Sequence, residues 1–353
     1  MTQKLKRQLA PRAWELLQAS NAERIAFIQT DRWIGYPQAK DALEQMERLL
    51  NYPNVSRPQN MLLVTETNNG KTTIAKRFRK LHPEVDDPAL EYTEIPVVVM
   101  DAPPSPDEDR FYNHMLDQLG AVYKIRAPKD AKLFQVRKLL RDMHVRVLIF
   151  DEINNSLAGT STMRQQMFNA IKNLGQAIER PIVLTGTFDA LVAVREDPQI
   201  QNRFKPLVLP RWELNSDFLQ LLASFETTLP LRRASHLSSE RLAPLLLVMS
   251  AYVIGELNNL LKAAAEKAIT SGTERITLKL LYDLDWVPPD LRDRHASAAA
   301  QGVKHKVSYR DLLSDLERRQ AEQEEQEEQD EDLEAAEVDL EESDLSGKDD
   351  LDP

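Results

Sequence analysis

The chain has 353 residues, enough for about two packed domains and a tail. It contains no cysteine, which excludes disulfides and thiolate metal sites, and its six histidines are too widely spaced to suggest a zinc site. The net charge of −11 is unevenly distributed, because residues 317–353 hold 18 acidic and 3 basic side chains, which leaves residues 1–316 at +4. A mildly basic body permits contact with nucleic acid but does not require it.

The first segment, residues 1–50, is expected to form a basic arm followed by helices. Residues 1–14 carry four basic side chains and no acidic one, which fits either a solvated start or an arm that touches DNA or a partner. Residues 13–50 show helical periodicity twice, interrupted by a loop at 32–37. The N-terminus lacks an apolar signal-peptide core, and no run of about 18 apolar residues occurs, so we expect neither secretion nor membrane insertion and place the protein in the cytoplasm.

Residues 51–212 alternate between short apolar runs and amphipathic stretches. The apolar runs predict strands at Met61–Val64, Ile95–Met100, Val145–Phe150, Ile182–Thr185 and Leu207–Leu209. Helices are expected between them, near 72–81, 108–119, 131–143 and 162–179. This alternation indicates a doubly wound α/β domain with a five-stranded parallel sheet, whose ligand should lie beyond the carboxyl ends of the strands.

The remaining sequence predicts a helical lid and an acidic tail. Helical spacing of apolar residues dominates after Pro210, with helices expected near 215–227, 238–250, 254–271 and 276–284, so we assign a lid to residues 213–285. Residues 286–353 are expected to be a linker and a disordered acidic tail, because the Glu/Gln/Asp run cannot bury enough apolar surface to order itself.

The loop after the first predicted strand has the pattern of a Walker A phosphate-binding loop. The residues expected to hold the phosphates of ATP are Asn68, Asn69, Gly70, Lys71, Thr72 and Thr73. Lys71 should reach the β- and γ-phosphate oxygens, and the Thr72 hydroxyl should hold Mg²⁺. Thr65 stands where the pattern usually begins with glycine, so we expect backbone strain there that weakens affinity.

The second half of an ATPase site follows the third predicted strand, where Asp151 and Glu152 end a run of four apolar residues. Asp151 is expected to reach Mg²⁺ through its water shell, and Glu152 to orient and deprotonate the attacking water. An acidic pair at a strand end can simply form a turn. Because this pair follows Lys71 by 80 residues, in the order that P-loop ATPases require, we expect an enzyme that hydrolyses ATP.

Two further residues point to the AAA+ branch of these ATPases. In Thr185-Gly186-Thr187, a hydroxyl at the strand end, assigned to Thr187, could hold the γ-phosphate or the water, although threonine is ordinary there. Arg203, before the fifth strand, is a candidate arginine finger for a neighbouring subunit's nucleotide; the alternative is a surface arginine bonded to helix-end carbonyls.

Seven segments spread over residues 20–285 make the sequence similar to the TniB family of transposition ATPases, whose relatives include TnsC and, more distantly, IstB and MuB. The segments are Asp31-Arg32-Trp33-Ile34 with Tyr36-Pro37, Thr67-Asn68-Asn69-Gly70-Lys71-Thr72, Phe150-Asp151-Glu152-Ile153-Asn154-Asn155, Thr185-Gly186-Thr187, Asp197-Pro198-Gln199 through Asn202-Arg203-Phe204, Leu209-Pro210-Arg211-Trp212, and Ile254-Gly255-Glu256-Leu257. The resemblance implies an ATP-dependent regulator that assembles on double-stranded DNA as a ring or helical filament, marks the target and recruits a DDE transposase. A target selector of the TniQ type often acts upstream.

The resemblance also implies site residues outside the Walker motifs. Trp33 and Tyr36 are expected near the adenine, with a buried tryptophan staple as the alternative. Many AAA+ lids carry an arginine where this chain has Glu256, so the γ-phosphate is sensed from elsewhere, by Lys262 or a neighbour's arginine, or hydrolysis is slow. Two other functions remain open: a nucleotide-gated DNA scaffold with negligible hydrolysis, and a loader-type ATPase that acts on a replication protein.

A basic cluster between the second and third predicted strands is the candidate DNA-binding surface. Its members are Lys124, Arg126, Lys129 and Lys132, with Tyr123 beside them. Contacts from such a row to DNA phosphates should be independent of sequence and sensitive to salt. The alternative is a solvated helix face.

Overall fold

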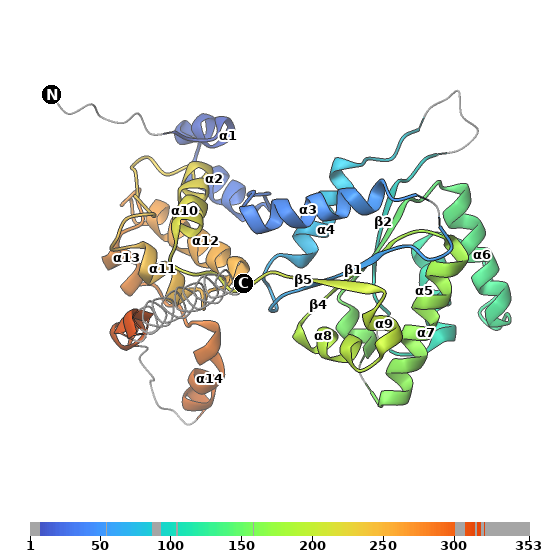
Figure 1. Cartoon of the computed structure of the whole chain (residues 1–353). Helices are drawn as coiled ribbons and strands as arrows, with labels where there is room; N and C mark the ends of the chain where they lie inside the picture. Colours follow the sequence, from blue (N-terminus) through green and yellow to red (C-terminus); the bar gives the residue numbers. More distant parts are fainter. Residues whose placement is uncertain are drawn as a thin grey trace, which may run out of the picture.

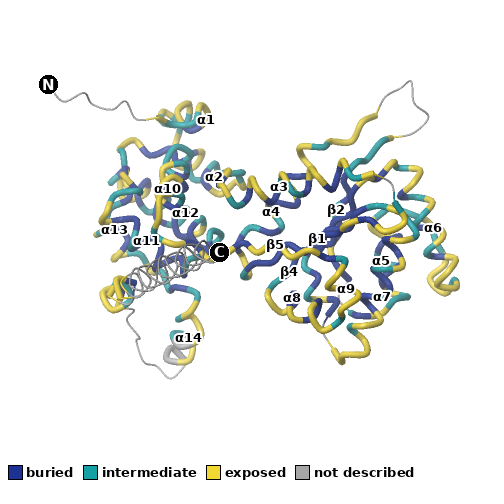
Figure 2. Tube along the Cα trace, viewed as in Figure 1, coloured by how far each residue is buried: buried dark blue, intermediate teal, exposed yellow. Residues whose placement is uncertain are grey.

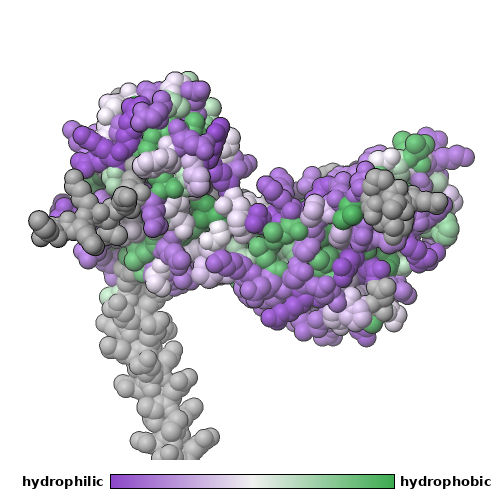
Figure 3. Space-filling model, turned by 90° about the horizontal axis from the view of Figure 1, so that it is seen from above, coloured by the Kyte–Doolittle hydropathy of each residue, from purple (hydrophilic) through white to green (hydrophobic). Residues whose placement is uncertain are grey.

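The computed structural model describes residues 8–53, 55–86, 93–103, 105–157, 159–300, 308–314, 316–318 and 321. Two lobes are visible, an α/β lobe that holds the sheet and a lobe made of helices (Figure 1). A narrowing separates them when the molecule is seen from above (Figure 3). Residues 1–7 of the predicted basic arm and most of the predicted acidic tail lie outside the described residues.

Five parallel strands form one sheet in the order β2-β3-β4-β1-β5. Their bounds are β1 Asn60–Val64, β2 Val97–Asp101, β3 Val147–Asp151, β4 Ile182–Gly186 and β5 Phe204–Val208. The predicted doubly wound α/β class is therefore confirmed. In this order β4 lies between β3 and β1. The loops that follow β1 and β3 therefore lie on either side of the carboxyl end of β4.

Alternating side chains of the strands fill two separate cores. Met61, Leu63 and Ile149 point to the face covered by α3 (Pro37–Leu50) and α4 (Lys71–Leu81). Leu62 and Phe150 point to the opposite face. That face is covered by α5 Glu108–Gln118, α6 Lys129–Asp142, α7 Ser161–Ile178 and α8 Phe188–Arg195. The strands β1, β3 and β4 are buried on both sides (Figure 2), as their nearly continuous apolar runs require.

The helical lobe combines helices from both halves of the sequence. Its C-terminal members are α10 Ser216–Thr228, α11 Ala243–Met249, α12 Ile254–Thr270 and α13 Leu278–Tyr282. The N-terminal elements α1 (Pro11–Glu15), η1 (Leu16–Gln18) and α2 (Asn21–Gln29) pack on them, and the Ala10 N–H donates a 2.8 Å hydrogen bond to the Thr227 carbonyl. Since α3 packs on α4 of the α/β lobe, the first 50 residues contribute to both lobes.

Two predicted elements begin three or more residues away from their observed starts. The helix expected from 238 begins only at Ala243, with Pro244 in its first turn, because the buried leucines before it lie in turns with the same apolar spacing. The fifth strand begins at Phe204 rather than 207, since it is an edge strand whose Lys205 is exposed. Two helices, α8 and α9 (Pro198–Gln201), connect β4 to β5.

Part of the segment expected to be a linker packs against the helical lobe. It contains η3 (Pro289–Leu291) and α14 (Arg292–Ala300), and the Tyr309 hydroxyl donates to the Trp286 carbonyl at 2.5 Å. Among the described residues no single helix is long and apolar enough to cross a membrane; α11 and α12 meet that test only as a pair bent by 112°.

Candidate functional site: a nucleotide pocket between the lobes

The loop between β1 and α4 has the backbone geometry of a phosphate-binding loop. Left-handed φ angles occur at Asn68 (61°) and Gly70 (95°), and α4 begins immediately afterwards at Lys71. Thr65, in contrast, has no left-handed φ; it is buried, and its Oγ1 accepts a hydrogen bond from Asn69 Nδ2 at 2.7 Å. The strain expected at Thr65 is therefore absent, because the loop places its left-handed residues further along and uses the hydroxyl as an internal support.

Lys71 joins the two halves of the predicted site. Its Nζ lies 4.0 Å from Glu152 Oε1 and donates to the Glu66 carbonyl at 3.1 Å, and the residue is 3% exposed. Burial lowers the pKa of the Lys71 ammonium, while the negative charges of Glu152, Asp151 and Glu66 oppose that shift. A buried cation therefore sits beside the acidic pair, at the place where the negative charge of a triphosphate would be neutralised.

The acidic pair is held by the neighbouring strand. Asp151 is the last residue of β3, and its Oδ1 accepts hydrogen bonds from Thr185 Oγ1 and, at 3.1 Å, from the Glu152 N–H. Glu152 has a left-handed φ of 54°, and its side chain is 45% exposed. This backbone conformation is costly for a non-glycine residue and recurs at functional sites. It turns the Glu152 carboxylate out of the strand toward Lys71, while Asp151 stays buried.

Thr187 is held by a residue that sequence analysis did not single out. The Thr187 Oγ1 accepts a hydrogen bond from Asn154 Nδ2, and the Thr187 N–H donates to Asn154 Oδ1 at 2.9 Å. Gly186 allows this approach, because a Cβ there would lie 2.7 Å from Asn154 Oδ1. Of the two threonines at the end of β4, the one that contacts Asp151 is Thr185. In the sequence, Asn154 was marked only by its place in the segment 150–155, one of the segments that resemble the TniB family.

A cavity of about 470 Å³ opens in front of the loop, between the two lobes. Its walls come from the 31–36 loop, the phosphate-binding loop and the first turns of α4, and from α12 of the helical lobe; they include Trp33, Tyr36, Gly70, Thr72, Thr73, Gly255 and Lys262. The volume falls within the range of small-molecule sites. The structure thus brings Trp33 and Tyr36 to the same cavity as the residues expected to hold the phosphates, and contact with adenine stays a prediction.

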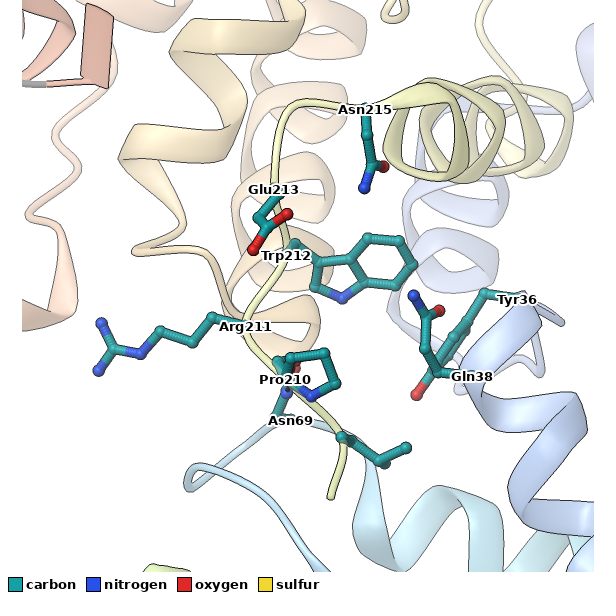
Figure 4. A pocket seen from close by; sticks show the side chains of 9 residues that line it. Tyr36, Gln38, Asn69, Pro210, Arg211, Trp212, Glu213 and Asn215 are labelled. Carbon is teal, nitrogen blue, oxygen red and sulfur yellow. Dashed lines mark hydrogen bonds between the residues drawn. The ribbon is translucent and has the colours of Figure 1, made fainter. Parts of the chain in front are cut away.

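Tyr36 has a packing role of the kind that the alternative interpretation gave to Trp33, which is only half-buried. It is 7% exposed, its ring meets the Trp212 ring edge-on with centroids 5.2 Å apart, and burial raises the pKa of Tyr36 to about 12. Figure 4 shows Tyr36, Gln38 and Trp212 around a smaller pocket at the junction of β5 and the helical lobe. Asn69 lies beside Pro210 in the same view, and Asn69 Nδ2 donates to the Pro210 carbonyl at 3.2 Å.

The side chains of both loop asparagines bind the protein itself. Asn68 Nδ2 donates to Glu256 Oε1 at 3.0 Å, and the Gly255 N–H donates to the Asn68 carbonyl at 3.0 Å. The Ile254 N–H donates to Asn69 Oδ1 at 3.2 Å. These bonds connect the loop to the start of α12. These side chains are therefore not free for phosphates, and contact between phosphates and the backbone N–H groups of this loop stays a prediction; the Asn69 N–H donates to the Glu66 carbonyl at 3.3 Å.

Glu256, which replaces the expected lid arginine, is bound by an arginine from further along the chain. Arg292 of α14 forms an ion pair with the Glu256 carboxylate and lies with its guanidinium carbon 5.7 Å from the Trp286 ring centre. Lys262 donates to the Gln29 carbonyl at 3.1 Å and lies 3.4 Å from Asp31 Oδ1. The Lys262 ammonium is therefore bound to α2 and the loop after it, although the residue lines the cavity.

Arg203 lies at the other end of the sheet from the cavity. Its carbonyl accepts a hydrogen bond from the Asn60 N–H at 3.1 Å, at the start of β1. The length of β1, roughly 15 Å, therefore separates it from the subunit's own phosphate-binding loop. Its Nε is buried and has no hydrogen-bond partner among the described residues, and burial, followed by the charge of Arg57, lowers the Arg203 pKa. Arg57, which sequence analysis did not consider, adds a second cation at this edge.

The predicted DNA-binding cluster is only partly exposed. Lys124 and Arg126 are exposed in the loop between α5 and α6, and Lys129 is exposed but lies 3.1 Å from Glu108. Lys132 is 1% exposed, and its Nζ bonds Asp109 at 2.7 Å and the Ile125 carbonyl at 2.6 Å. The assignment of Lys132 to DNA is wrong, because its ammonium is buried and fastens this loop to α5.

The chemistry of the donors fits a magnesium ion bound together with phosphates. Thr72 lines the cavity. The charge of Asp151 acts on Lys71, the residue before Thr72, so a hydroxyl and a carboxylate lie close to the expected phosphate position. Mg²⁺ prefers oxygen ligands and usually binds through one or two protein groups plus phosphates and water. In the part of the chain that the structure describes, no three His, Cys, Asp or Glu side chains converge, so a site formed by protein ligands alone is not seen there.

Comparisons with solved structures agree with this fold. Similar solved structures include Aeropyrum pernix ORC2 in ADPNP and ADP complexes (18% identity, TM-score 0.52, 83% of this chain and 88% of that chain). They also include Pyrobaculum aerophilum Cdc6p (15%, 0.54, 83% and 89%) and A. pernix ORC1 in complex with DNA (15%, 0.52, 73% and 68%). At these identities the likeness shows the fold alone, an AAA+ P-loop fold with a helical lid. No curated protein sequence matches significantly.

A family model described as "Bacterial TniB protein" matches residues 24–214, more than half of the chain. The matched range contains the phosphate-binding loop, the acidic pair, Thr187 and Arg203. The chain therefore belongs to the TniB family.

Proposed function

We propose that this protein is an ATP-dependent regulator of DNA transposition. In this proposal it assembles on duplex DNA as a ring or helical filament, marks the target site, and recruits or activates a DDE transposase, with a TniQ-like selector upstream, in the bacterial cytoplasm. The observation that carries the proposal is the 4.0 Å approach of Lys71 Nζ to Glu152 Oε1 in a TniB family member. A P-loop cation and a carboxylate that can activate water are what triphosphate hydrolysis needs.

Each residue has one role in this mechanism. The Lys71 ammonium and the backbone N–H groups of residues 68–73 bind the phosphates. Bound Mg²⁺, held from Thr72 and Asp151, would neutralise charge on the phosphate oxygens. As the oxygen of the attacking water bonds to the γ-phosphorus, Glu152 accepts a proton from that water. The bond between the γ-phosphorus and the bridging oxygen of the leaving ADP breaks in the same step. Asn154 fixes Thr187, and Thr185 fixes Asp151, so the acidic end of β3 keeps its orientation during the reaction.

Two substitutions test the assignment. In Glu152→Gln, ATP binding should persist while hydrolysis falls about 10²- to 10⁴-fold, because the general base is lost, and the protein should remain longer on DNA. In Lys71→Ala, both ATP binding and ATP-dependent DNA binding should be lost. The measurements are phosphate release, binding of a fluorescent ATP analogue, and dissociation from labelled duplex. A Glu152→Gln protein that hydrolyses ATP at the normal rate would remove the assignment.

Electron microscopy tests the assembly. The purified protein is imaged with duplex DNA in ATP, in a non-hydrolysable analogue and without nucleotide. Rings or filaments that form on DNA only with nucleotide are expected. Monodisperse particles that ignore DNA in all three conditions would contradict the proposal.

A nucleotide-gated DNA scaffold with negligible hydrolysis is the second candidate. It is favoured by the Glu256–Arg292 ion pair, because a carboxylate occupies the position of a lid arginine and binds the nearest arginine of α14. Measured turnover separates the two: slow but Glu152-dependent hydrolysis supports the first function, and hydrolysis equally absent from wild type and Glu152→Gln supports the scaffold.

A further inference from the structure

A second cavity lies at the edge of the sheet where β3 and β4 begin, away from the nucleotide pocket. Its volume is about 570 Å³, and its walls come from the ends of α6 and α7, the turns into β3 and β4, and Leu50 and Tyr52 after α3. The nucleotide pocket lies at the carboxyl ends of the strands, so the sheet separates the two cavities. This cavity therefore cannot contribute to the nucleotide site of the same subunit.

Arginines dominate the charge of this cavity. The four that line it are Arg137, Arg141, Arg146 and Arg180. None of them forms an ion pair with a carboxylate in the described ranges of the chain. Glu94, Glu179 and His144 also line the cavity. The cavity therefore holds more cationic than anionic groups, and its arginines are not neutralised by close pairing.

The backbone places these arginines around the cavity. α6 ends in a turn with His144 in the left-handed region (φ 53°), in which the His144 and Val145 N–H groups donate to the Arg141 and Leu140 carbonyls at 2.9 and 3.0 Å. This turn puts Arg141 and Arg146 on either side of it.

Two of the guanidiniums are anchored to neighbouring segments. Arg180 Nε donates to the Val145 carbonyl at 3.0 Å, and Arg146 Nη2 donates to Asn51 Oδ1 at 3.2 Å. Each of these bonds uses one of a guanidinium's five N–H donors. The anchored groups therefore keep most of their donors for a ligand.

The positive charge of these arginines exceeds the negative charge of their surroundings. Burial lowers the pKa of Arg180, and the positive charges of Arg146 and Arg141 lower it further, with Glu179 opposing. The carboxyl ends of α6 and α7 attract cations, but each helix end carries only about half a negative charge. The two helix ends thus offset about one of the four guanidiniums, and Glu94 and Glu179 offset two more, so about one positive charge remains for an external anion.

We propose that this arginine cluster, formed by Arg137, Arg141, Arg146 and Arg180, binds backbone phosphates of duplex DNA; the inference rests on the proposed function. The planar guanidinium pairs with two phosphate oxygens at once. α6 connects the cluster to Lys129 at its other end, and with 14 residues it is about 21 Å long. Lys124 and Arg126 precede that end. A long polyanion can contact both ends of α6, which a single phosphate cannot.

The test is a salt series of DNA binding by the full-length protein carrying Arg141→Ala and Arg146→Ala together. Fluorescence anisotropy of a labelled duplex is measured with a non-hydrolysable ATP analogue present. Loss of two phosphate contacts should reduce the slope of log affinity against log salt by about 1.8, and weaken binding roughly fifty-fold at about 0.1 M salt. The reduction should be equal on unrelated duplex sequences.

The matched control removes two exposed arginines from the helical lobe, Arg241→Ala and Arg275→Ala, and should keep the wild-type slope. Both double variants should bind a fluorescent ATP analogue like wild type. Sodium phosphate should weaken DNA binding no more than sodium chloride at equal ionic strength.

Each alternative has its own outcome. If wild type binds ATP but no duplex, the proposed function and this inference fall together. If wild type binds duplex and the Arg141/Arg146 variant has the same slope, only the inference is overturned. An unchanged slope with faster proteolysis of the C-terminal acidic segment would assign the cluster to that segment's carboxylates. Selective displacement of DNA by millimolar phosphate would make it a site for small anions.

Discussion

At the scale of single residues, the nucleotide site departs from the usual ATPase motif at Thr65 and Glu256, and neighbouring groups hydrogen-bond or ion-pair with both residues. Thr65 replaces a glycine without left-handed angles and accepts a hydrogen bond from Asn69. Glu152 has the left-handed φ that its position after β3 requires. Glu256 replaces an arginine and is bound by Asn68 and Arg292. A motif comparison alone would count Thr65 and Glu256 as defects, whereas both are bonded parts of the structure.

Arg203 is expected to act on a neighbouring subunit's nucleotide, since its own phosphate-binding loop lies at the opposite end of β1. Arg203→Ala should leave ATP binding unchanged and reduce hydrolysis by the assembled protein, by up to about 10³-fold. Arg195→Ala, an exposed arginine of α8, is the control and should hydrolyse normally. The measurement is phosphate release as a function of protein concentration with DNA present; an Arg203→Ala protein with wild-type turnover would show that this arginine has only a structural role.

The buried ion pair between Arg24 and Glu274 should make stability depend on pH. Arg24 is fully buried, and its hydrogen bond to Glu274, followed by contacts from Arg232, lowers the pKa of Glu274 below 4.5 against the effect of burial. A carboxyl whose folded pKa is lowered stabilises the fold above its unfolded pKa, and that contribution is lost as the pH falls through the folded value.

Glu274→Gln should therefore reduce the free energy of unfolding by about 3 kcal/mol near pH 7, because it leaves Arg24 without its counter-charge. The difference from wild type should shrink as the pH falls below 4.5. Urea unfolding at several pH values measures both, with the exposed Glu240→Gln as control. A difference that is independent of pH would show that the Glu274 charge does not contribute.

At the scale of the elements, the contact between α12 and the phosphate-binding loop forms the wall of the nucleotide pocket that belongs to the helical lobe. A Cβ at Gly255 would lie 2.2 Å from Asn68 Oδ1 and 2.3 Å from the Asn68 carbonyl oxygen, which is backbone and cannot move aside freely. Gly255→Ala should therefore push α12 away from the loop and weaken ATP binding at least about tenfold, with the fold retained.

The control for Gly255→Ala is Gly272→Ala. Gly272 follows the end of α12 with a left-handed φ of 71°, and a Cβ there would meet no atom within 4 Å. This change should cost about 1 kcal/mol of stability through backbone strain and leave ATP affinity unchanged. Titration with a fluorescent ATP analogue and urea unfolding distinguish the two effects; equal ATP affinities in both variants would contradict the role given to Gly255.

For the whole molecule, the pocket between the lobes means that a bound nucleotide contacts both. A ligand that binds only the folded, closed arrangement stabilises it by about 2.7 kcal/mol at 100 times its dissociation constant. ATP should therefore slow amide hydrogen exchange in α4 and also in α12, although the two helices belong to different lobes.

Glu256→Ala should weaken this coupling, because it removes the carboxylate that binds both Asn68 and Arg292. In this variant ATP should still protect α4 but protect α12 less than in wild type. Glu44→Ala, an exposed carboxylate on α3, is the control. If ATP protects α12 equally in Glu256→Ala and wild type, the coupling runs through other contacts, such as the Gly255 N–H.

The sequence by itself determined the α/β class, the five strands, and the residues of the two ATPase motifs, because apolar periodicity and short motifs are local properties of the chain. Only the tertiary structure decided which charged side chains are exposed and which are buried or paired. Lys132 and Lys124 look alike in sequence, but one is buried against Asp109 and the other is exposed. Arg180 lies 39 residues after Arg141 in the sequence, and the pairing of β3 with β4 brings both to one cavity. The local sequence pattern cannot predict such groupings, because the burial of a side chain and the charges beside it depend on how distant segments of the chain pack.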